Sequence, residues 1–153
     1  MNINSAIQQP RFRNEYQRVM VNILYSSGWI TDNQKKFLEP EDITPQQYNI
    51  LRILRGSPKP LSTLQIRERM LDKMSDTSRI VDRLLAKGLV SKSKCTTDKR
   101  LVDILINEKG LELLERLDSR NHELDHMVAS SLSEEEAMEL NTLLDKMRSG
   151  VSV

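Results

Sequence analysis

The chain has 153 residues, of which 38% are hydrophobic and 29% are charged, and its net charge is +1. This length favours a single domain, and the balance of residue types excludes an intrinsically disordered chain. The sequence has no apolar run of about 18 residues, which excludes an ordinary membrane-spanning helix.

The compartment is indicated by cysteine usage and by the N-terminus. The single cysteine, Cys95, excludes an intrachain disulfide and suits a reducing environment. The first residues, MNINSAIQQPRFRNEY, lack the apolar core of a signal peptide. We therefore expect a cytoplasmic protein with no membrane partner.

Charge is distributed unevenly along the chain. Residues 1–61 carry 8 basic and 5 acidic side chains, residues 62–106 carry 10 and 6, and residues 107–153 carry 5 and 11. A basic middle segment followed by an acidic one indicates that the middle segment meets an anionic partner.

The first part of the chain predicts two helices. Apolar residues at helical spacing between Phe12 and Leu24 define one face of a first helix. After the sequence EPED, Thr44 and Gln47 form a capping box with Pro45 at the first helical position. This combination predicts that a second helix begins there.

The middle of the chain predicts a winged helix-turn-helix over residues 44–106. Ser62 and Gln65 form a second capping box, and Ser75 is placed to cap the next helix, which Gly88 closes. After Gly88 the sequence pattern changes from that of a helix to that of extended strands. The segments LVSKSK and LVDILI predict two strands joined by the loop CTTDKR.

Two further helices are expected after the hairpin. Asn107 should cap a long helix that runs to about Ser130, and Ser133 with Glu136 forms a third capping box before the last helix. The predicted fold is mainly α (α+β), a single domain over residues 1–153 with a winged helix-turn-helix at its centre.

The flanking helices carry apolar faces that a small winged-helix core cannot cover. A helix from residue 107 to 130 would span about 35 Å at about 1.5 Å per residue. Exposed apolar faces need a partner, and a second copy is the economical one. We therefore expect residues 1–38 and 107–153 to form dimerisation helices, in a two-fold homodimer that binds a pseudo-palindromic operator in double-stranded DNA.

The helix after Ser75 is the expected DNA-reading element, because the second helix of a helix-turn-helix enters the major groove. Ile80, Val81 and Leu84 should face inward. The opposite side carries the candidate DNA contacts Ser75, Ser78, Arg79 and Arg83. We expect Arg79 to pair with guanine and Arg83 to meet phosphate.

The hairpin supplies a second set of candidate DNA contacts. They are Lys92, Lys94, Asp98, Lys99 and Arg100. Asp98 is placed to hold the Arg100 guanidinium by a charge-assisted hydrogen bond. A guanidinium presented at a loop tip suits insertion into the narrow minor groove.

Residues 61–110, LSTLQIRERMLDKMSDTSRIVDRLLAKGLVSKSKCTTDKRLVDILINEKG, resemble the multiple-antibiotic-resistance regulator (MarR) family. The resemblance rests on RLLAKGLV, on D-K-R in the wing, on LVDILI and on NEKG. It implies a dimeric winged-helix transcription regulator with intertwined terminal helices that responds to small phenolic or lipophilic ligands, oxidants or metals. It also implies that Asp98 and Arg100 form the wing contact. Where the family usually has basic residues at the wing base, this chain has Ser91 and Ser93.

The stretch from His122 to His126 reads HELDH and matches the zinc motif H-E-x-x-H. A catalytic zinc needs a third ligand and an open coordination position, and the chain has no further histidine. We therefore expect no enzyme, no bound metal and no cofactor. A zinc-responsive regulator remains an alternative, with carboxylates such as Glu39, Glu41 or Asp42 completing the site.

Two further possibilities concern signals. Basic neighbours would make Cys95 reactive toward oxidants. Trp29, Tyr25 or Tyr48 would line a cavity for a small aromatic or lipophilic effector.

Our prediction is a sequence-specific DNA-binding transcription regulator, a homodimeric repressor that responds to a small molecule. The alternatives are the zinc-responsive regulator and a winged-helix protein-interaction module, which would not need a basic hairpin.

Overall fold

The computed structural model describes residues 1–94, 97–98 and 100–150. The chain divides into two compact units, Met1–Leu114 and Glu115–Val153. Among the described residues, no helix combines the length and the apolar composition that a membrane span requires.

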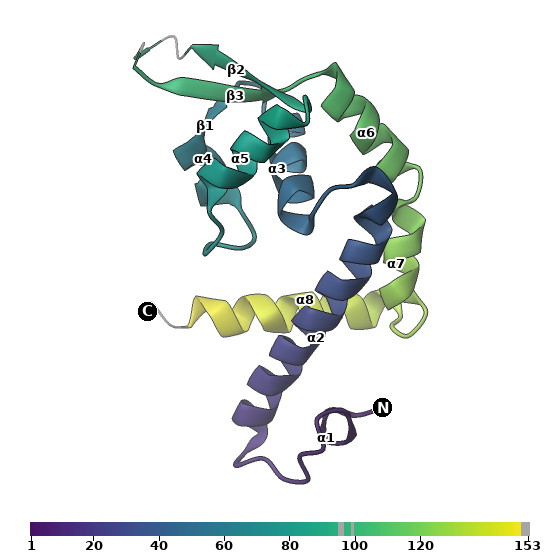
Figure 1. The fold of residues 1–153 in the computed structure, drawn as a ribbon. Coiled ribbons are helices and arrows are strands. Elements are labelled where there is room, and N and C mark those ends of the chain that lie inside the picture. Colours follow the sequence, from purple (N-terminus) through teal and green to yellow (C-terminus); the bar gives the residue numbers. More distant parts are fainter. Residues whose placement is uncertain (95–96, 99, 151–153) are drawn as a thin grey trace. The chain divides into compact units, whose positions relative to one another are not determined.

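The first unit contains most of the secondary structure (Figure 1). Its helices are α1 (Ile3–Ala6), α2 (Glu15–Leu38), the 3-10 helix η1 (Glu39–Glu41), α3 (Pro45–Arg55), α4 (Thr63–Arg69) and α5 (Thr77–Ala86). Its strands are β1 (Leu61–Ser62), β2 (Val90–Lys94) and β3 (Val102–Ile106). Helix α6 (Glu108–Asp118) begins in this unit, and the second unit contains α7 (Asn121–Ala129) and α8 (Glu134–Ser149).

The sheet is antiparallel with the strand order β1-β3-β2. In β3, Ile104 pairs with Leu61 of β1 on one side and with Lys92 of β2 on the other. The two-stranded hairpin that the sequence predicts is therefore the larger part of a three-stranded sheet. Strand β1 was not predicted, because two residues are too few to produce a periodic pattern.

The core of the first unit lies between the sheet and helices α3, α4 and α5, which contact one another. Helices α3 and α4 also contact β3, and α5 contacts β2. Its fully buried side chains include Ile50, Leu51, Ile66, Met70 and Leu84. This packing fixes α5 and the hairpin on one rigid support, so the two candidate DNA-contacting elements have a defined relation to each other.

Four of the predicted N-terminal capping signals are confirmed. Thr44, Ser62 and Ser133 each accept a hydrogen bond from the backbone N–H three residues on, with the reciprocal side-chain bond in place. The Asn107 side chain accepts from the Gly110 N–H at 3.0 Å at the start of α6. Each signal depends only on residues within one helical turn, which is why the sequence alone reveals it.

Gly88 ends α5 in the left-handed conformation, with φ of +69°. The Gly88 N–H donates to the Leu85 carbonyl at 3.0 Å, and the Leu89 N–H donates to the Leu84 carbonyl at 3.1 Å. These bonds turn the chain from α5 directly into β2, as the predicted C-terminal cap requires.

Two predicted starts are wrong by a few residues. Asp76, and not Ser75, caps α5, because its carboxylate accepts from the Arg79 N–H at 3.2 Å. Phe12 lies before α2, which begins at Glu15 after the Asn14 cap.

The long helix predicted from 107 to 130 is also wrong, because it is two helices. Helix α6 ends at Asp118, and the Arg120 N–H donates to the Leu117 carbonyl at 2.9 Å in a tighter turn. Helix α7 starts at Asn121. The apolar stripe is interrupted at Asn121 and resumes at Leu124, so helical periodicity predicted one helix in place of two. The predicted fold class, a mainly helical winged helix-turn-helix, is confirmed.

Candidate nucleic-acid interface

Helix α5 buries one side and exposes the other. Val81 and Leu84 are buried and Ile80 is half-buried, as predicted. The exposed side carries Ser78, Arg79, Asp82 and Arg83. Ser78 and Arg79 therefore face solvent at the N-terminal end of the helix, where a helix-turn-helix reads base edges, and Arg83 lies one turn further on.

Ser75 is placed differently from its neighbours. Its Oγ atom is buried and has no hydrogen-bond partner among the described residues. The Thr77 Oγ1 atom is in the same situation. The Ser75 hydroxyl therefore turns toward the protein, whereas Ser78 and Arg79 turn toward solvent.

The wing contains a preorganised arginine. The Arg100 Nε donates to Asp98 Oδ1 and the Arg100 Nη2 donates to Asp98 Oδ2, both at 3.1 Å. The Arg100 backbone N–H donates to the same carboxylate at 3.0 Å. The predicted charge-assisted bond is present, and it is bidentate. Because 89% of the Arg100 side chain is exposed, its remaining donors stay available.

Arg100 also sets the protonation of its partner. The hydrogen bond from its guanidinium, with a smaller contribution from its backbone N–H, lowers the pKa of the Asp98 carboxyl. A lowered folded-state pKa means that the pair persists above the ordinary carboxyl pKa and is lost only as pH falls through the lowered value. The Asp98 carboxyl therefore stays ionised throughout the neutral range.

Strand β2 presents the other basic side chains of the hairpin. Lys92 and Lys94 are exposed, whereas Ser91 and Ser93, which alternate with them, are half-buried. The two lysines share one face of the strand, as predicted. Lys99 and Cys95 lie outside the described residues, so the predicted reactivity of Cys95 toward oxidants stays a prediction.

The turn between α4 and α5 carries a feature that the sequence did not reveal. Leu71 and Met74 are exposed, although Met70 beside them is in the core. The Leu71 N–H donates to the Asn49 side chain of α3 at 2.9 Å, which ties this turn to the core. Neither periodicity nor capping distinguishes these residues from core residues, because the turn is irregular.

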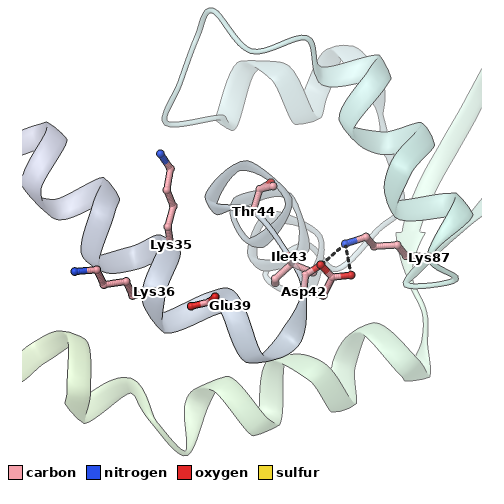
Figure 2. A pocket seen from close by; sticks show the side chains of 7 residues that line it. All are labelled: Lys35, Lys36, Glu39, Asp42, Ile43, Thr44 and Lys87. Atoms are coloured by element: carbon pink, nitrogen blue, oxygen red, sulfur yellow. Dashed lines mark hydrogen bonds and ion pairs between the residues drawn. The ribbon is translucent and has the colours of Figure 1, made fainter.

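A pocket of about 360 Å³ lies where α2, η1 and α3 meet the end of α5 (Figure 2). It is lined by Lys35, Lys36, Glu39, Asp42, Ile43, Thr44 and Lys87. The predicted aromatic lining residues Trp29, Tyr25 and Tyr48 are not part of it. Trp29 and Tyr25 are exposed on α2, and Tyr48 is buried in the core.

Lys87 connects the end of α5 to the segment before α3. Its Nζ donates to the Asp42 carbonyl, lies 3.8 Å from Asp42 Oδ2 and donates to Gln47 Oε1 at 3.4 Å. Figure 2 shows Lys87 reaching across to Asp42. The pocket therefore borders a contact that fixes the recognition helix.

The histidines of HELDH are exposed on α7. Glu123 between them is held by the Arg120 guanidinium at 2.8 Å, and this hydrogen bond lowers the pKa of its carboxyl. In the described part of the chain, no group of three or more histidine, cysteine, aspartate or glutamate side chains is arranged to hold a metal. The zinc-responsive alternative has no support in this structure.

Helices α2 and α8 each leave apolar side chains exposed. On α2 these are Tyr16, Val19, Met20, Leu24, Tyr25, Trp29 and Ile30. On α8 they are Met138, Leu140, Leu143 and Met147. These two helices therefore carry unpartnered apolar faces, as predicted. On α6, in contrast, the prediction of an uncovered stripe is wrong, because Leu114 and Leu117 are fully buried.

Comparison with known proteins agrees with this architecture. Residues 43–102 match the model of the MarR family. Over 118 residues the chain is 28% identical to the HTH-type transcriptional repressor IacR of Pseudomonas putida, covering 77% of this chain and 70% of IacR.

Solved structures are similar across most of the chain. A mutant MarR of E. coli complexed with operator DNA superposes with a TM-score of 0.81 at 22% identity, covering 90% of this chain and 98% of that one. The organohalide-sensing regulator RdhR in its 2,4-dichlorophenol-bound form gives a TM-score of 0.79 at 22% identity, covering 89% and 80%. The part of the chain that contains the winged helix-turn-helix, residues 43–102, thus matches the MarR family, and these solved structures share the fold of most of the chain.

Proposed function

We propose that the chain is a cytoplasmic, sequence-specific double-stranded DNA-binding transcription regulator that acts as a homodimeric repressor and is not an enzyme. The observation that carries the proposal is that helix α5 and the wing, held on the same core, both present hydrogen-bond donors to solvent. Helix α5 presents Ser78, Arg79 and Arg83, and the wing presents Arg100 on Asp98. The similar E. coli structure holds operator DNA, and the relative IacR is a repressor, which supports this proposal.

The two elements are assigned different contacts. Arg79 on the recognition helix is assigned to base edges in the major groove, where its paired donors fit guanine. Arg83, Lys92, Lys94 and Lys99 are assigned to phosphates, which position the protein without specifying sequence. Arg100 is assigned to the minor groove. Residues 44–106 are thus the DNA-binding part.

Dimerisation is assigned to residues 1–38 and 107–153. The exposed apolar side chains of α2 and α8 would be buried by a second copy, which would also supply a second recognition helix. Two such helices about one DNA turn apart read an inverted repeat.

Regulation by a small molecule is assigned to the pocket beside Lys87. Its volume lies near the lower end of the range of about 300–1,000 Å³ that small ligands use. It borders both α2 and the end of α5, so an occupant there touches the terminal segment and the recognition helix together. The structure of RdhR, a regulator with the same fold, was solved with 2,4-dichlorophenol bound. This supports a small aromatic effector for the present chain.

Two variants test the interface on a selected duplex. Arg79→Ala should cost about 1–3 kcal/mol of binding free energy and relax the preference at one base pair in each half-site. Arg100→Ala should weaken binding to most sequences and reduce the salt slope by about 1. Lys146→Ala on α8, which removes the same charge elsewhere, is the control and should leave both unchanged. Parent-like binding by both interface variants would refute the site, and weak, salt-insensitive binding by the parent would favour a protein-interaction module.

A further inference from the structure

Two apolar side chains stand at the edge of the proposed DNA-reading surface. Leu71 is 85% exposed and Met74 is 93% exposed in the turn between α4 and α5. Such exposure of large apolar side chains in an ordered turn is unfavourable unless a partner covers them.

The backbone of this turn is fixed by hydrogen bonds. The Met74 N–H donates to Asp72 Oδ1 at 3.0 Å, and the Ser75 N–H donates to the Asp72 carbonyl at 3.3 Å. The Leu71 N–H is bound to Asn49 of α3. The exposure of both side chains is therefore a property of the fold, because hydrogen bonds within the turn and to α3 fix the backbone that carries them.

The turn leads directly into the recognition helix. Met74 is two residues before the Asp76 cap, and Ser78 and Arg79 lie in the first turn of α5. Figure 1 shows the turn at the N-terminal end of α5. A duplex whose bases reach Arg79 therefore also comes close to this turn.

The chemistry of the DNA major groove indicates which group Leu71 and Met74 would contact. Phosphates need cations or hydrogen-bond donors, which the side chains of Leu71 and Met74 do not offer. The major groove displays one apolar group, the 5-methyl group of thymine. A protein partner is disfavoured, because two side chains are far too few for a specific interface of about 1,000 Å².

We propose that Met74, with Leu71 beside it, contacts thymine 5-methyl groups in each operator half-site, next to the base pair that Arg79 reads. The inference rests on the proposed function. It adds a thymine preference to a surface whose other contacts are polar. Burial of one methyl group is worth about a fourfold change in affinity, from the transfer free energy of a methylene-sized group.

A double-mutant cycle between protein and DNA tests this contact. Each thymine of a selected duplex is replaced in turn by deoxyuridine in both half-sites, which removes only the methyl group. The parent should lose about fourfold in affinity for each methyl group removed at one or two positions per half-site. Met74→Ser should bind the thymine and deoxyuridine duplexes equally at one of those positions, and Leu71→Ser at a neighbouring one.

Two controls separate this contact from the rest of the interface. Met74→Leu keeps an apolar side chain and should keep the methyl preference. Arg79→Ala should bind more weakly while retaining it. Equal binding of thymine and deoxyuridine duplexes by the parent, or an unchanged penalty in Met74→Ser, would overturn the contact while leaving sequence-specific binding intact. Failure to select any duplex would overturn the proposed function and this inference together.

Discussion

Helices α2 and α5 are both amphipathic, but the large apolar residues of α5 are buried or half-buried within the chain and most of those of α2 are exposed. In α5, Val81 and Leu84 are buried within the chain, and the outward side is polar and charged. In α2, only Phe37 and Leu38 at its end are buried, while Leu24 is 73% exposed. The apolar pattern of α5 is thus satisfied by folding, whereas the pattern of α2 requires association with another surface.

A charge in the exposed stripe of α2 should have the most severe consequence. Leu24→Glu should dissociate the dimer, because a carboxylate would be buried without a partner. Loss of the second recognition helix should lower operator affinity by at least about 100-fold. Sedimentation and DNA titration would measure both effects.

Asn22→Glu provides the matched control, because Asn22 is polar and exposed on the same helix, about 160° around its axis from Leu24. This variant should remain dimeric. If Leu24→Glu also remained a dimer with normal affinity, the stripe would not be the interface.

Truncation of α5 on its buried side should act on folding instead. Leu84 is fully buried, so Leu84→Ala should cost about 2–5 kcal/mol in the free energy of unfolding. Because Leu24 is 73% exposed, Leu24→Ala should cost far less when the free energy of unfolding is measured on the monomer at low protein concentration. Denaturant unfolding of the two alanine variants would measure both costs. Equal costs would contradict the difference between α5 and α2.

Gly110 provides a smaller test within the winged block. A Cβ atom there would collide with the Leu89 carbonyl oxygen and lie 2.7 Å from Ile106 Cγ1. Gly110→Ala should therefore push α6 from the base of the hairpin at a cost of about 1–3 kcal/mol. Gly28→Ala on α2, where a Cβ atom meets nothing within 4 Å, should leave stability unchanged or raise it. Thermal unfolding would measure both.

The mildest of these changes concerns the wing. Asp98→Asn should leave the free energy of unfolding unchanged, because the pair is at the surface. It should lower operator affinity on the order of three- to tenfold, since Arg100 would no longer be held. Because the pKa of Asp98 is lowered, the parent should keep its wing contribution as pH falls from 8 to about 5. A steep loss of affinity over that range, not shared by Asp98→Asn, would contradict the pairing.

The sequence predicts features that depend on neighbouring residues. The capping pairs begun by Thr44, Ser62 and Ser133, the Gly88 cap and the Asp98–Arg100 bond lie within a few residues of one another, and all are present. The charged face of α5 follows from helical spacing. This is why most candidate contacts are found on exposed surface.

Features that depend on distant residues could not be predicted. Burial of the Ser75 hydroxyl and exposure of Met74 depend on how the turn packs on α3. The bond from Lys87 to Asp42 joins residues 45 positions apart. Periodicity shows which face of a helix is apolar, but not whether the chain itself covers that face.

Selection of bound duplexes from a random library, with the winning duplex titrated at several salt concentrations, would decide whether this chain reads DNA sequence. We predict an enriched inverted repeat with half-sites about one helical turn apart, bound at least about 1,000-fold more tightly than random DNA. Enrichment of no sequence by the protein, in the absence and presence of small aromatic ligands, would contradict its assignment as a DNA-binding regulator.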